Sequence, residues 1–251
     1  MLQKRVIPCL LWREGSLVKT IKFNKFNYIG DPANTIRIFN ELEADEIILL
    51  DITASSKSKD PDYKIINEVS NECFMPLTYG GGVNSINQMK KILKIGVEKI
   101  SINTSAVMDT NFITEASKFF GKQCVVGSID FKRNAFGKNK VYINSGKRMV
   151  DMDPVEWAIK LEKLGVGELI VTSIENDGTW SGYDCDLMQS ITDNVSIPVV
   201  ANGGAGSLKH IYNLFKTTNS SAAAVGSFVV YQKKNMGVLI NFPEKEHLLI
   251  Q

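Results

Sequence analysis

The chain has 251 residues, 44% of them hydrophobic and 22% charged, and a formal net charge of +2. This composition is typical of a globular protein, the near-neutral charge argues against a nucleic-acid partner, and no apolar stretch reaches the roughly 20 residues of a membrane span. The N-terminus leads into a strand pattern without a signal peptide, and the four cysteines are widely spaced. We therefore expect a cytoplasmic protein with buried thiols rather than disulfides.

Histidine is scarce in this sequence. Only His210 and His247 occur, and neither lies near a cysteine or the other histidine in sequence. This argues against a zinc site and against a Ser-His-Asp triad. The sequence indicates no metal and no organic cofactor, so proton transfer would fall to carboxylates, lysines or hydroxyls.

Short apolar runs alternate with helix-like segments along the chain. The pattern predicts eight strands, at Val6–Leu11, Glu46–Asp51, Met75–Tyr79, Lys99–Ile102, Cys124–Asp130, Glu168–Ser173, Pro198–Ala201 and Ala222–Gly226. It predicts helices that include Pro32–Leu42, Tyr63–Cys73, Ile86–Ile95, Pro154–Leu164 and Leu208–Phe215. Nearly continuous apolar strands favour a parallel sheet covered by helices. The connections after the first and fifth strands, Trp12–Gly30 and Phe131–Met152, are predicted to be long loops.

A layout of prolines, glycines and serines occurs twice, 122 residues apart. The matched positions are Pro76, Gly81, Gly82 and Ser105 in the first copy and Pro198, Gly203, Gly204 and Ser227 in the second. Two equivalent halves predict a duplicated half-barrel closed on itself, because half a barrel leaves an open sheet edge. The length fits one (β/α)₈ barrel of roughly 250 residues. We expect a single α/β domain over residues 1–251, a TIM barrel built from two similar half-barrels.

Each glycine pair follows a short apolar strand, and a loop of small residues follows the next strand. Backbone N–H groups in such loops can bind an anion; tight turns alone are the plainer alternative, but the repetition favours phosphate. Two such cradles predict a ligand with two phosphate ends. The candidate phosphate-binding residues are Gly81, Gly82, Asn103 and Thr104 in the first cradle, and Gly203, Gly204, Gly226 and Ser227 in the second, with Asp177 and Gly178 beside it.

Several motifs together resemble one family, the cyclase subunit of imidazole glycerol phosphate synthase. They are the segments 50–55, 80–82, 101–104, 172–174, 177–179, 181–184 and 203–206, and the likeness covers about residues 1–230. The resemblance implies a (β/α)₈ barrel that pairs with a glutamine amidotransferase. Ammonia from that partner would pass through the barrel to a bis-phosphate substrate, which becomes imidazole glycerol phosphate and an aminoimidazole carboxamide ribotide.

The family's chemistry rests on two aspartates, at the ends of the first and fifth strands. Asp130 supplies the second, but Leu11 stands at the first position, opposite Asp130 in the internal repeat. Ring closure needs one group to take a proton while another gives one, so Leu11 predicts weakened or lost cyclase chemistry. Asp130 alone could also be a strand-end carboxylate without a catalytic role. Lys19 stands in the first connection, where the family has a lysine, and could bind a phosphate or substrate oxygen or be a solvated loop lysine.

Four charged residues begin strands one, two, four and six: Arg5, Glu46, Lys99 and Glu168. Two acids and two bases could close into a neutral ring across the barrel floor. The resemblance implies that these positions form the gate through which ammonia enters. A stabilising cluster of salt bridges is the alternative, since the N-terminal face of such barrels usually serves stability.

The C-terminal tail, about residues 232–251, departs from the family. It contains Gly237 and Pro243, both unfavourable inside a helix, where the family usually ends in an amphipathic helix.

A second resemblance, to accessory cyclase-like proteins of bacterial surface-polysaccharide pathways, rests on other parts of the chain. They are the segments 10–11, 17–23, 28–32, 36–41 and 71–76. That resemblance implies a role with a sugar amidotransferase, which turns an acetamido group of a sugar into an acetamidino group.

Three functions remain as hypotheses. The preferred one is a barrel subunit that receives ammonia from a glutaminase at its N-terminal face. It would pass this ammonia on for amidation of an acetamido sugar in lipopolysaccharide or O-antigen biosynthesis. The second is a true cyclase subunit of histidine biosynthesis, and the third is a non-catalytic scaffold that activates the glutaminase. The expected partners are the glutaminase, a phosphate-bearing ligand and a sugar amidotransferase, without nucleic acid or membrane.

Overall fold

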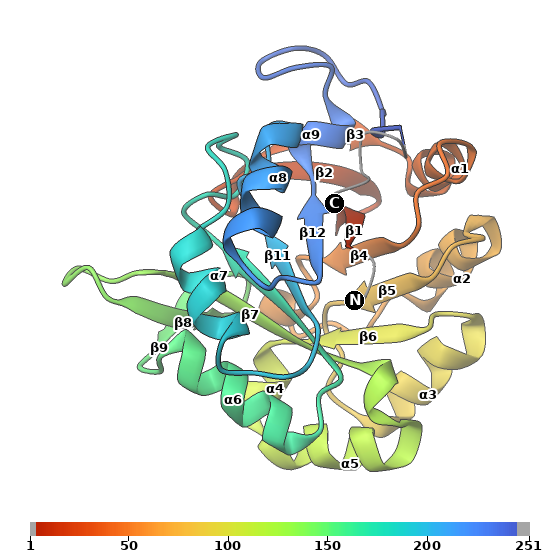
Figure 1. The fold of residues 1–251 in the computed structure, drawn as a ribbon. Helices are drawn as coiled ribbons and strands as arrows, with labels where there is room; N and C mark the ends of the chain where they lie inside the picture. Colours follow the sequence, from red (N-terminus) through yellow and green to blue (C-terminus); the bar gives the residue numbers. More distant parts are fainter. Residues whose placement is uncertain (1–3, 245–251) are drawn as a thin grey trace.

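The computed structural model describes residues 4–244 and shows a closed barrel of parallel strands (Figure 1). The barrel strands are β1 (Arg5–Arg13), β4 (Ile47–Asp51), β5 (Leu77–Gly80), β6 (Lys99–Ile102), β7 (Val125–Arg133), β10 (Glu168–Ser173), β11 (Val199–Asn202) and β12 (Ala222–Val225). Each pairs with its neighbours in parallel, and the β7–β10 and β1–β12 pairs complete the ring. The predicted eight strands and the TIM-barrel fold are confirmed. Among residues 4–244, no helix is both long and apolar enough to cross a bilayer.

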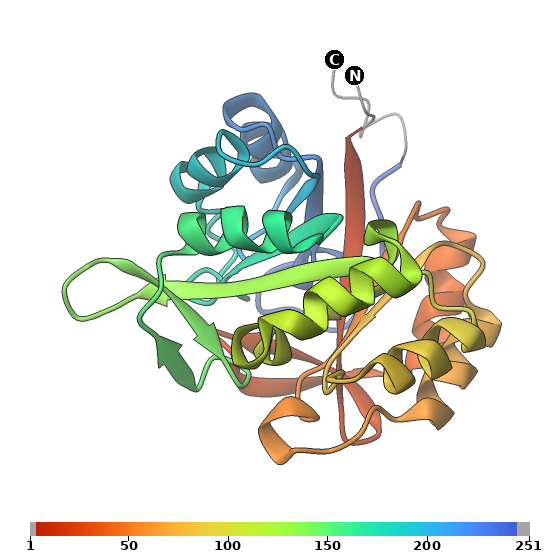
Figure 2. The same cartoon turned by 90° about the horizontal axis from the view of Figure 1, so that it is seen from below.

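Helices surround the barrel (Figure 2). The longer ones are α1 (Pro32–Glu41), α2 (Tyr63–Glu72), α3 (Ile86–Ile95), α5 (Thr110–Phe120), α6 (Pro154–Leu164), α7 (Cys185–Thr192) and α8 (Leu208–Thr217). The short ones are α4 (Thr104–Met108), α9 (Ser227–Val230), η1 (Ser55–Lys57) and η2 (Lys122–Cys124). Each longer helix begins after an Asp or Ser whose side chain accepts a backbone N–H of the first turn. The sequence prediction did not include α5 and α7, although Asp109 and Asp184 cap them in this way.

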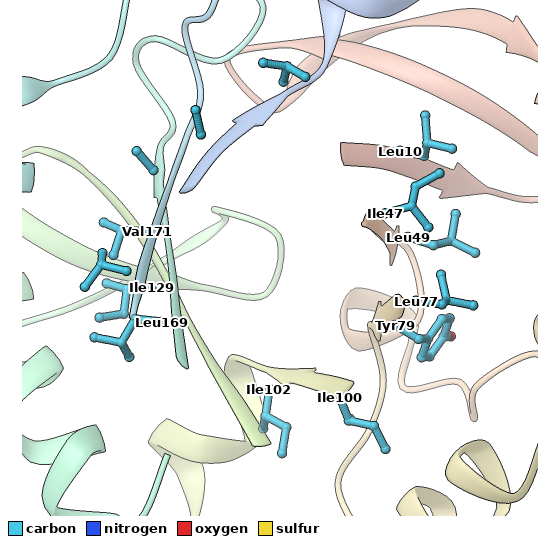
Figure 3. Close-up of a cluster of buried hydrophobic side chains, with 14 of the residues drawn as sticks. Leu10, Ile47, Leu49, Leu77, Tyr79, Ile100, Ile102, Ile129, Leu169 and Val171 are labelled. Atoms are coloured by element: carbon cyan, nitrogen blue, oxygen red, sulfur yellow. The ribbon is translucent and has the colours of Figure 1, made fainter. Parts of the chain in front are cut away.

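The core has two layers, one on each face of the strands. The outer layer packs the strands against the helices, and Figure 3 shows part of it: Leu10, Ile47, Leu49, Leu77, Tyr79, Ile100, Ile102, Ile129, Leu169 and Val171. The inner layer fills the barrel itself with Ile7, Cys9, Leu11, Val18, Ile48, Val126, Ile170, Val200, Ala222 and Ala224. Because side chains alternate between the two faces of a strand, both layers draw on the same strands. This explains why the strands read as nearly continuous apolar runs.

The two connections predicted as long loops are β-hairpins instead. Strands β2 (Ser16–Ile21) and β3 (Asn24–Gly30) follow β1, and β8 (Asn139–Ile143) and β9 (Arg148–Val150) follow β7. In each case the first hairpin strand pairs antiparallel with the preceding barrel strand. The prediction was wrong because apolar residues of both connections are buried, Leu17 and Val18 in the first and Val141 and Ile143 in the second. Burying them leaves their backbone groups to be paired, and the hairpin ladders supply that pairing.

Each hairpin is held by the opposite half of the barrel. The Thr20 hydroxyl donates to Asp177 Oδ2 over 2.6 Å, and the Phe23 N–H donates to the same oxygen over 3.1 Å. In the other direction, Ser145 Oγ in the turn between β8 and β9 donates to the carbonyl of Ile52, after β4, over 2.7 Å. The C-terminal end of the barrel is therefore shaped by contacts in both directions across the two halves.

The chain forms no further helix between α9 and residue 244. An antiparallel bridge between Tyr231 and Val238 closes a small loop. The Phe242 ring then meets Phe39 of α1 edge-on, with 6.3 Å between the centroids. Within the described residues, the tail is thus non-helical: residues 232–239 are exposed, and Phe242 packs on α1. Residues 245–251 of the predicted tail, and His247 with them, lie outside the described residues.

Candidate functional site

A cavity of about 290 Å³ lies at the C-terminal ends of the barrel strands. Its lining includes every residue that the sequence proposed for catalysis or phosphate binding: Leu11, Lys19, Gly81, Gly82, Asn103, Thr104, Asp130, Asp177, Gly178, Gly203, Gly204, Gly226 and Ser227. Barrel closure brings these positions together from both halves of the chain. The four charged residues proposed as a gate do not line this cavity.

The first glycine of each cradle makes the same close backbone approach. Gly81 and Gly203 have φ angles of +114° and +91°, which L side chains rarely adopt. A Cβ on Gly81 would lie 2.3 Å from the carbonyl oxygen of Asp51, and one on Gly203 would lie 2.6 Å from that of Ser173. Asp51 and Ser173 are themselves 122 residues apart. The internal repeat is therefore a repeat of backbone geometry, and only glycine fits at either position.

The remaining parts of the two cradles also correspond. Gly82 and Gly204 have φ angles of +74° and +107°. Asn103 and Gly226, which precede α4 and α9, adopt nearly equal dihedrals, φ −119° and ψ −84° against φ −116° and ψ −91°. Neither of these two positions supplies a side-chain cap. The first N–H groups of both short helices are thus left for another partner. In the first cradle, Ser55 Oγ accepts the Gly82 N–H over 3.3 Å, a contact that the sequence did not reveal.

Strand register shows that Leu11 and Asp130 are structural equivalents. Leu11 lies opposite Leu50 in the β1–β4 pair, and Asp130 lies opposite Thr172 in the β7–β10 pair. Leu50 and Thr172 are related by the 122-residue repeat. Leu11 is only 8% exposed and also lies opposite Val18 of β2. An apolar side chain therefore occupies the position that is equivalent to Asp130 in the other half of the barrel.

Asp130 is held by neutral donors. Asn103 Nδ2 donates to its Oδ2 over 2.8 Å, and the Thr172 hydroxyl also hydrogen-bonds it. Burial raises the pKa of Asp130 to about 7; the negative charge of Asp177 adds to this, while the two hydrogen bonds oppose it. Near neutral pH the carboxyl can therefore either give or take a proton.

The other carboxylates lining the cavity already have partners. Asp51 Oδ1 accepts the N–H groups of Thr53 and Ala54 over 2.8 and 3.0 Å. Asp177 holds the β2–β3 hairpin, and burial raises its pKa although Thr20, Phe23 and Lys19 oppose the shift. The expected place of Asp177 beside the second cradle is observed, but its side chain binds the hairpin. Both carboxylates are therefore already engaged in hydrogen bonds.

Lys19 lines the cavity and is not a solvated loop lysine. Its side chain is buried, and Nζ donates to the carbonyl of Cys9 over 2.8 Å. Burial lowers the pKa of Lys19. A Cβ on Gly226 would lie 2.3 Å from Nζ, so the ammonium lies directly against the second cradle. The charge is well placed to meet an anion bound there.

The four proposed gate residues form a closed ring at the other end of the barrel. Arg5 donates to Glu46 over 2.5 Å and to Glu168 over 2.6 Å, and Lys99 Nζ lies 2.6 Å from Glu46 and 2.8 Å from Glu168. Burial alone would lower the pKa values of Arg5 and Lys99, but the two carboxylates raise both overall. Arg5 and Lys99 thus stay charged near neutral pH, and each is paired with both carboxylates. Its neutral, alternating arrangement matches the sequence expectation.

One family model and several known proteins are similar to this chain over most of its length. The family model described as "Histidine biosynthesis protein" matches residues 5–235. A protein of Pseudomonas aeruginosa, provisionally named imidazole glycerol phosphate synthase subunit hisF2, is 48% identical over 248 residues, 99% of each chain. A provisionally named subunit hisF3 of Vibrio vulnificus is 41% identical over 244 residues, 97% of this chain and 94% of the relative. The imidazole glycerol phosphate synthase subunit HisF of Lactococcus lactis is 45% identical over 232 residues, 92% of this chain and 90% of the relative.

The raised pKa of Asp130 predicts a pH-dependent stability. The folded chain holds this proton up to about pH 7, whereas the unfolded chain releases it near pH 3.9. The folded state therefore loses stability relative to the unfolded state as the pH rises from about 4 to about 7. We expect the free energy of unfolding of the wild type, relative to Asp130→Asn, to fall by about 1–3 kcal/mol from pH 5 to pH 8. Urea unfolding of both proteins measures this; a constant difference would show an ordinary carboxyl at Asp130.

A Cβ in the second cradle should prevent anion binding. In Gly204→Ala the new Cβ would lie 2.0 Å from the carbonyl oxygen of Gly182, so the loop must shift. We expect at least tenfold weaker binding of inorganic phosphate in calorimetric titration. Gly137→Ala is the matched control, because Gly137 also has a positive φ, +75°, but has nothing within 4 Å of its Cβ position. Equal phosphate affinity in wild type and Gly204→Ala would contradict the cradle.

Proposed function

Since the chain belongs to the family of HisF cyclase subunits of imidazole glycerol phosphate synthase, we propose that its barrel passes ammonia from a glutaminase to an acceptor enzyme. The acceptor in this proposal is a cytoplasmic sugar amidotransferase, which converts an acetamido sugar to an acetamidino sugar in lipopolysaccharide or O-antigen biosynthesis. The observation that carries the proposal is Leu11 in the place equivalent to Asp130. A leucine can neither give nor take a proton, and losing a positioned acid–base group costs about 10²–10⁴-fold in rate.

The ring at the barrel floor supports a retained path for ammonia. It holds four charges at the price of removing them from water, and replacing a buried ion cluster by apolar residues is often neutral or stabilising. Stability alone therefore gives little reason to keep all four. A glutaminase seated on the N-terminal face would deliver ammonia at this ring. We assign the gate to Arg5, Glu46, Lys99 and Glu168 on this basis.

The relatives support an accessory copy of the subunit. Two of them carry the numerals 2 and 3 in their names, hisF2 and hisF3. A second copy is free to lose cyclase chemistry when another copy in the cell retains it. The proposal that the acceptor acts on a sugar rests on the likeness of segments such as 17–23 and 36–41 to accessory proteins of surface-polysaccharide pathways.

A second candidate, the cyclase reaction of histidine biosynthesis, is favoured by two observations. Both cradles keep their glycine geometry, and Asp130 has a pKa of about 7, which suits a group that alternates between acid and base. A single residue of this kind could serve both proton transfers at a reduced rate. The two candidates differ in what purified protein does with free ammonia.

Restoring the missing carboxylate provides the decisive test. Purified protein is given the bis-phosphate ribonucleotide substrate and excess ammonium salt, without glutaminase, and the ribotide product is followed by chromatography. We expect no detectable turnover in the wild type and measurable turnover in Leu11→Asp. Leu11→Asn is the control, because it has similar size and polarity but cannot exchange a proton. Wild-type turnover at the rate of a two-aspartate cyclase would refute the ammonia-passing proposal.

The ring can be tested by removing one cation. In the complex with its glutaminase, Lys99→Ala leaves Glu46 and Glu168 with Arg5 alone. We expect glutamine-dependent transfer of ammonia to the acceptor to fall at least tenfold, while the glutaminase still binds. Lys4→Ala is the matched control, since Lys4 directly precedes Arg5 of β1 but donates to the carbonyl of Ser220 outside the ring. Unchanged transfer in Lys99→Ala would show that the barrel is a scaffold or that the ring is only structural.

A further inference from the structure

An exposed apolar surface lies beside the mouth of the cavity. Strand β3 and the tail loop of residues 231–239 form it, and we call these two segments the rim surface. The Tyr231 side chain reaches Asn27 of β3, so the two segments adjoin, and Figure 1 shows the tail passing next to β3. The large apolar side chains of this surface are 44–67% exposed: Phe26, Tyr28, Met236, Val238 and Leu239. Such a gathering on a folded domain marks an interaction site.

The rim surface is continuous with the cavity. The β2–β3 hairpin lines the cavity with Phe23, Asn24 and Phe26. On the tail side, Lys234 Nζ donates over 3.1 Å to the carbonyl of Thr179, the residue after Gly178 of the cavity lining. A protein seated on the rim surface would therefore lie at the mouth of the barrel.

The charge and the backbone of the rim surface indicate what kind of protein would bind. Its exposed lysines, and Lys22 of the hairpin turn beside them, take part in no ion pair within residues 4–244: Lys22, Lys25, Lys233 and Lys234. Of the acidic residues that flank the hairpin in sequence, Asp31 accepts the N–H of Asn34 at the start of α1, and Glu14 is paired with Lys57. Among the strands of residues 4–244, β3 pairs only with β2, so its other edge offers backbone groups to a partner. An acidic rim around an apolar centre is complementary to this surface.

We propose that the rim surface is the docking site of the enzyme that accepts the ammonia, and that this enzyme presents an acidic surface there. The inference rests on the proposed function, because it requires ammonia to leave through the mouth. Ammonia released at an open mouth would be protonated and diluted in water. A direct junction with the acceptor prevents that loss. Stable junctions of this kind bury about 800 Å² on each side.

The test uses the complex of this chain with its glutaminase and the purified sugar amidotransferase, with binding followed by surface plasmon resonance. Tyr28→Ala combined with Leu239→Ala should weaken binding at least tenfold, since aromatic and apolar anchors carry most of the affinity of an interface. Lys25→Glu combined with Lys233→Glu should slow association and remove its dependence on salt. The matched controls are Ile38→Ala on the exposed side of α1, where Ile38 is 37% exposed, and Lys90→Glu on α3.

Formation of the acetamidino sugar from glutamine gives the second readout. We expect it to fall in both double variants while binding of the glutaminase and phosphate affinity remain those of the wild type. Equal binding and equal transfer in the wild type and the double variants would overturn the docking site alone. Double variants that instead abolish a homodimer of this chain would overturn it in favour of a second copy as the occupant. A wild-type complex that neither binds nor supplies the amidotransferase would overturn the proposed function as well.

Discussion

Closure of the eight parallel strands is the constraint on which the rest of this structure depends. Two seams, β6 with β7 and β12 with β1, join the halves. Once they are made, the C-terminal ends of all the strands meet at one mouth and their N-terminal starts at one floor. Residues as distant in sequence as Leu11 and Ser227 then line one cavity. Neither half alone could form the cavity or the charged ring, because each half contributes one glycine cradle and each half contributes ring residues.

The charged side chains at the two ends of the barrel have different kinds of partner. At the floor, two bases and two acids satisfy one another within 2.8 Å, and nothing there is available for chemistry. At the mouth, Asp130 has only neutral donors and Lys19 has a carbonyl as its partner. The apolar inner layer lies between them. Leu11 belongs to this apolar layer and also lines the cavity at the mouth.

The sequence predicted the parts of the structure that local patterns determine. Strands β6 and β10 begin and end where their apolar runs do, and the spacing of Gly81 and Gly203 revealed the duplicated backbone. The two hairpins were missed because their residues are ordered by distant partners: Thr20 and Phe23 by Asp177, and Ser145 by Ile52. The charged ring could be predicted because it requires only that the starts of four strands converge. The burial of Lys19, by contrast, depends on the hairpin that carries it, and no local pattern contains that information.

The shape of the mouth depends on both halves of the barrel, because contacts cross between them. Asp177 in the second half holds the first hairpin, and Ile52 in the first half holds the turn of the second. A force that lifts one hairpin is therefore resisted by the other half of the barrel and carried through both seams. The two halves are thus joined by reciprocal hairpin contacts as well as by strand pairing. Separating the two halves would break the contacts that hold both hairpins, and the mouth would lose its shape.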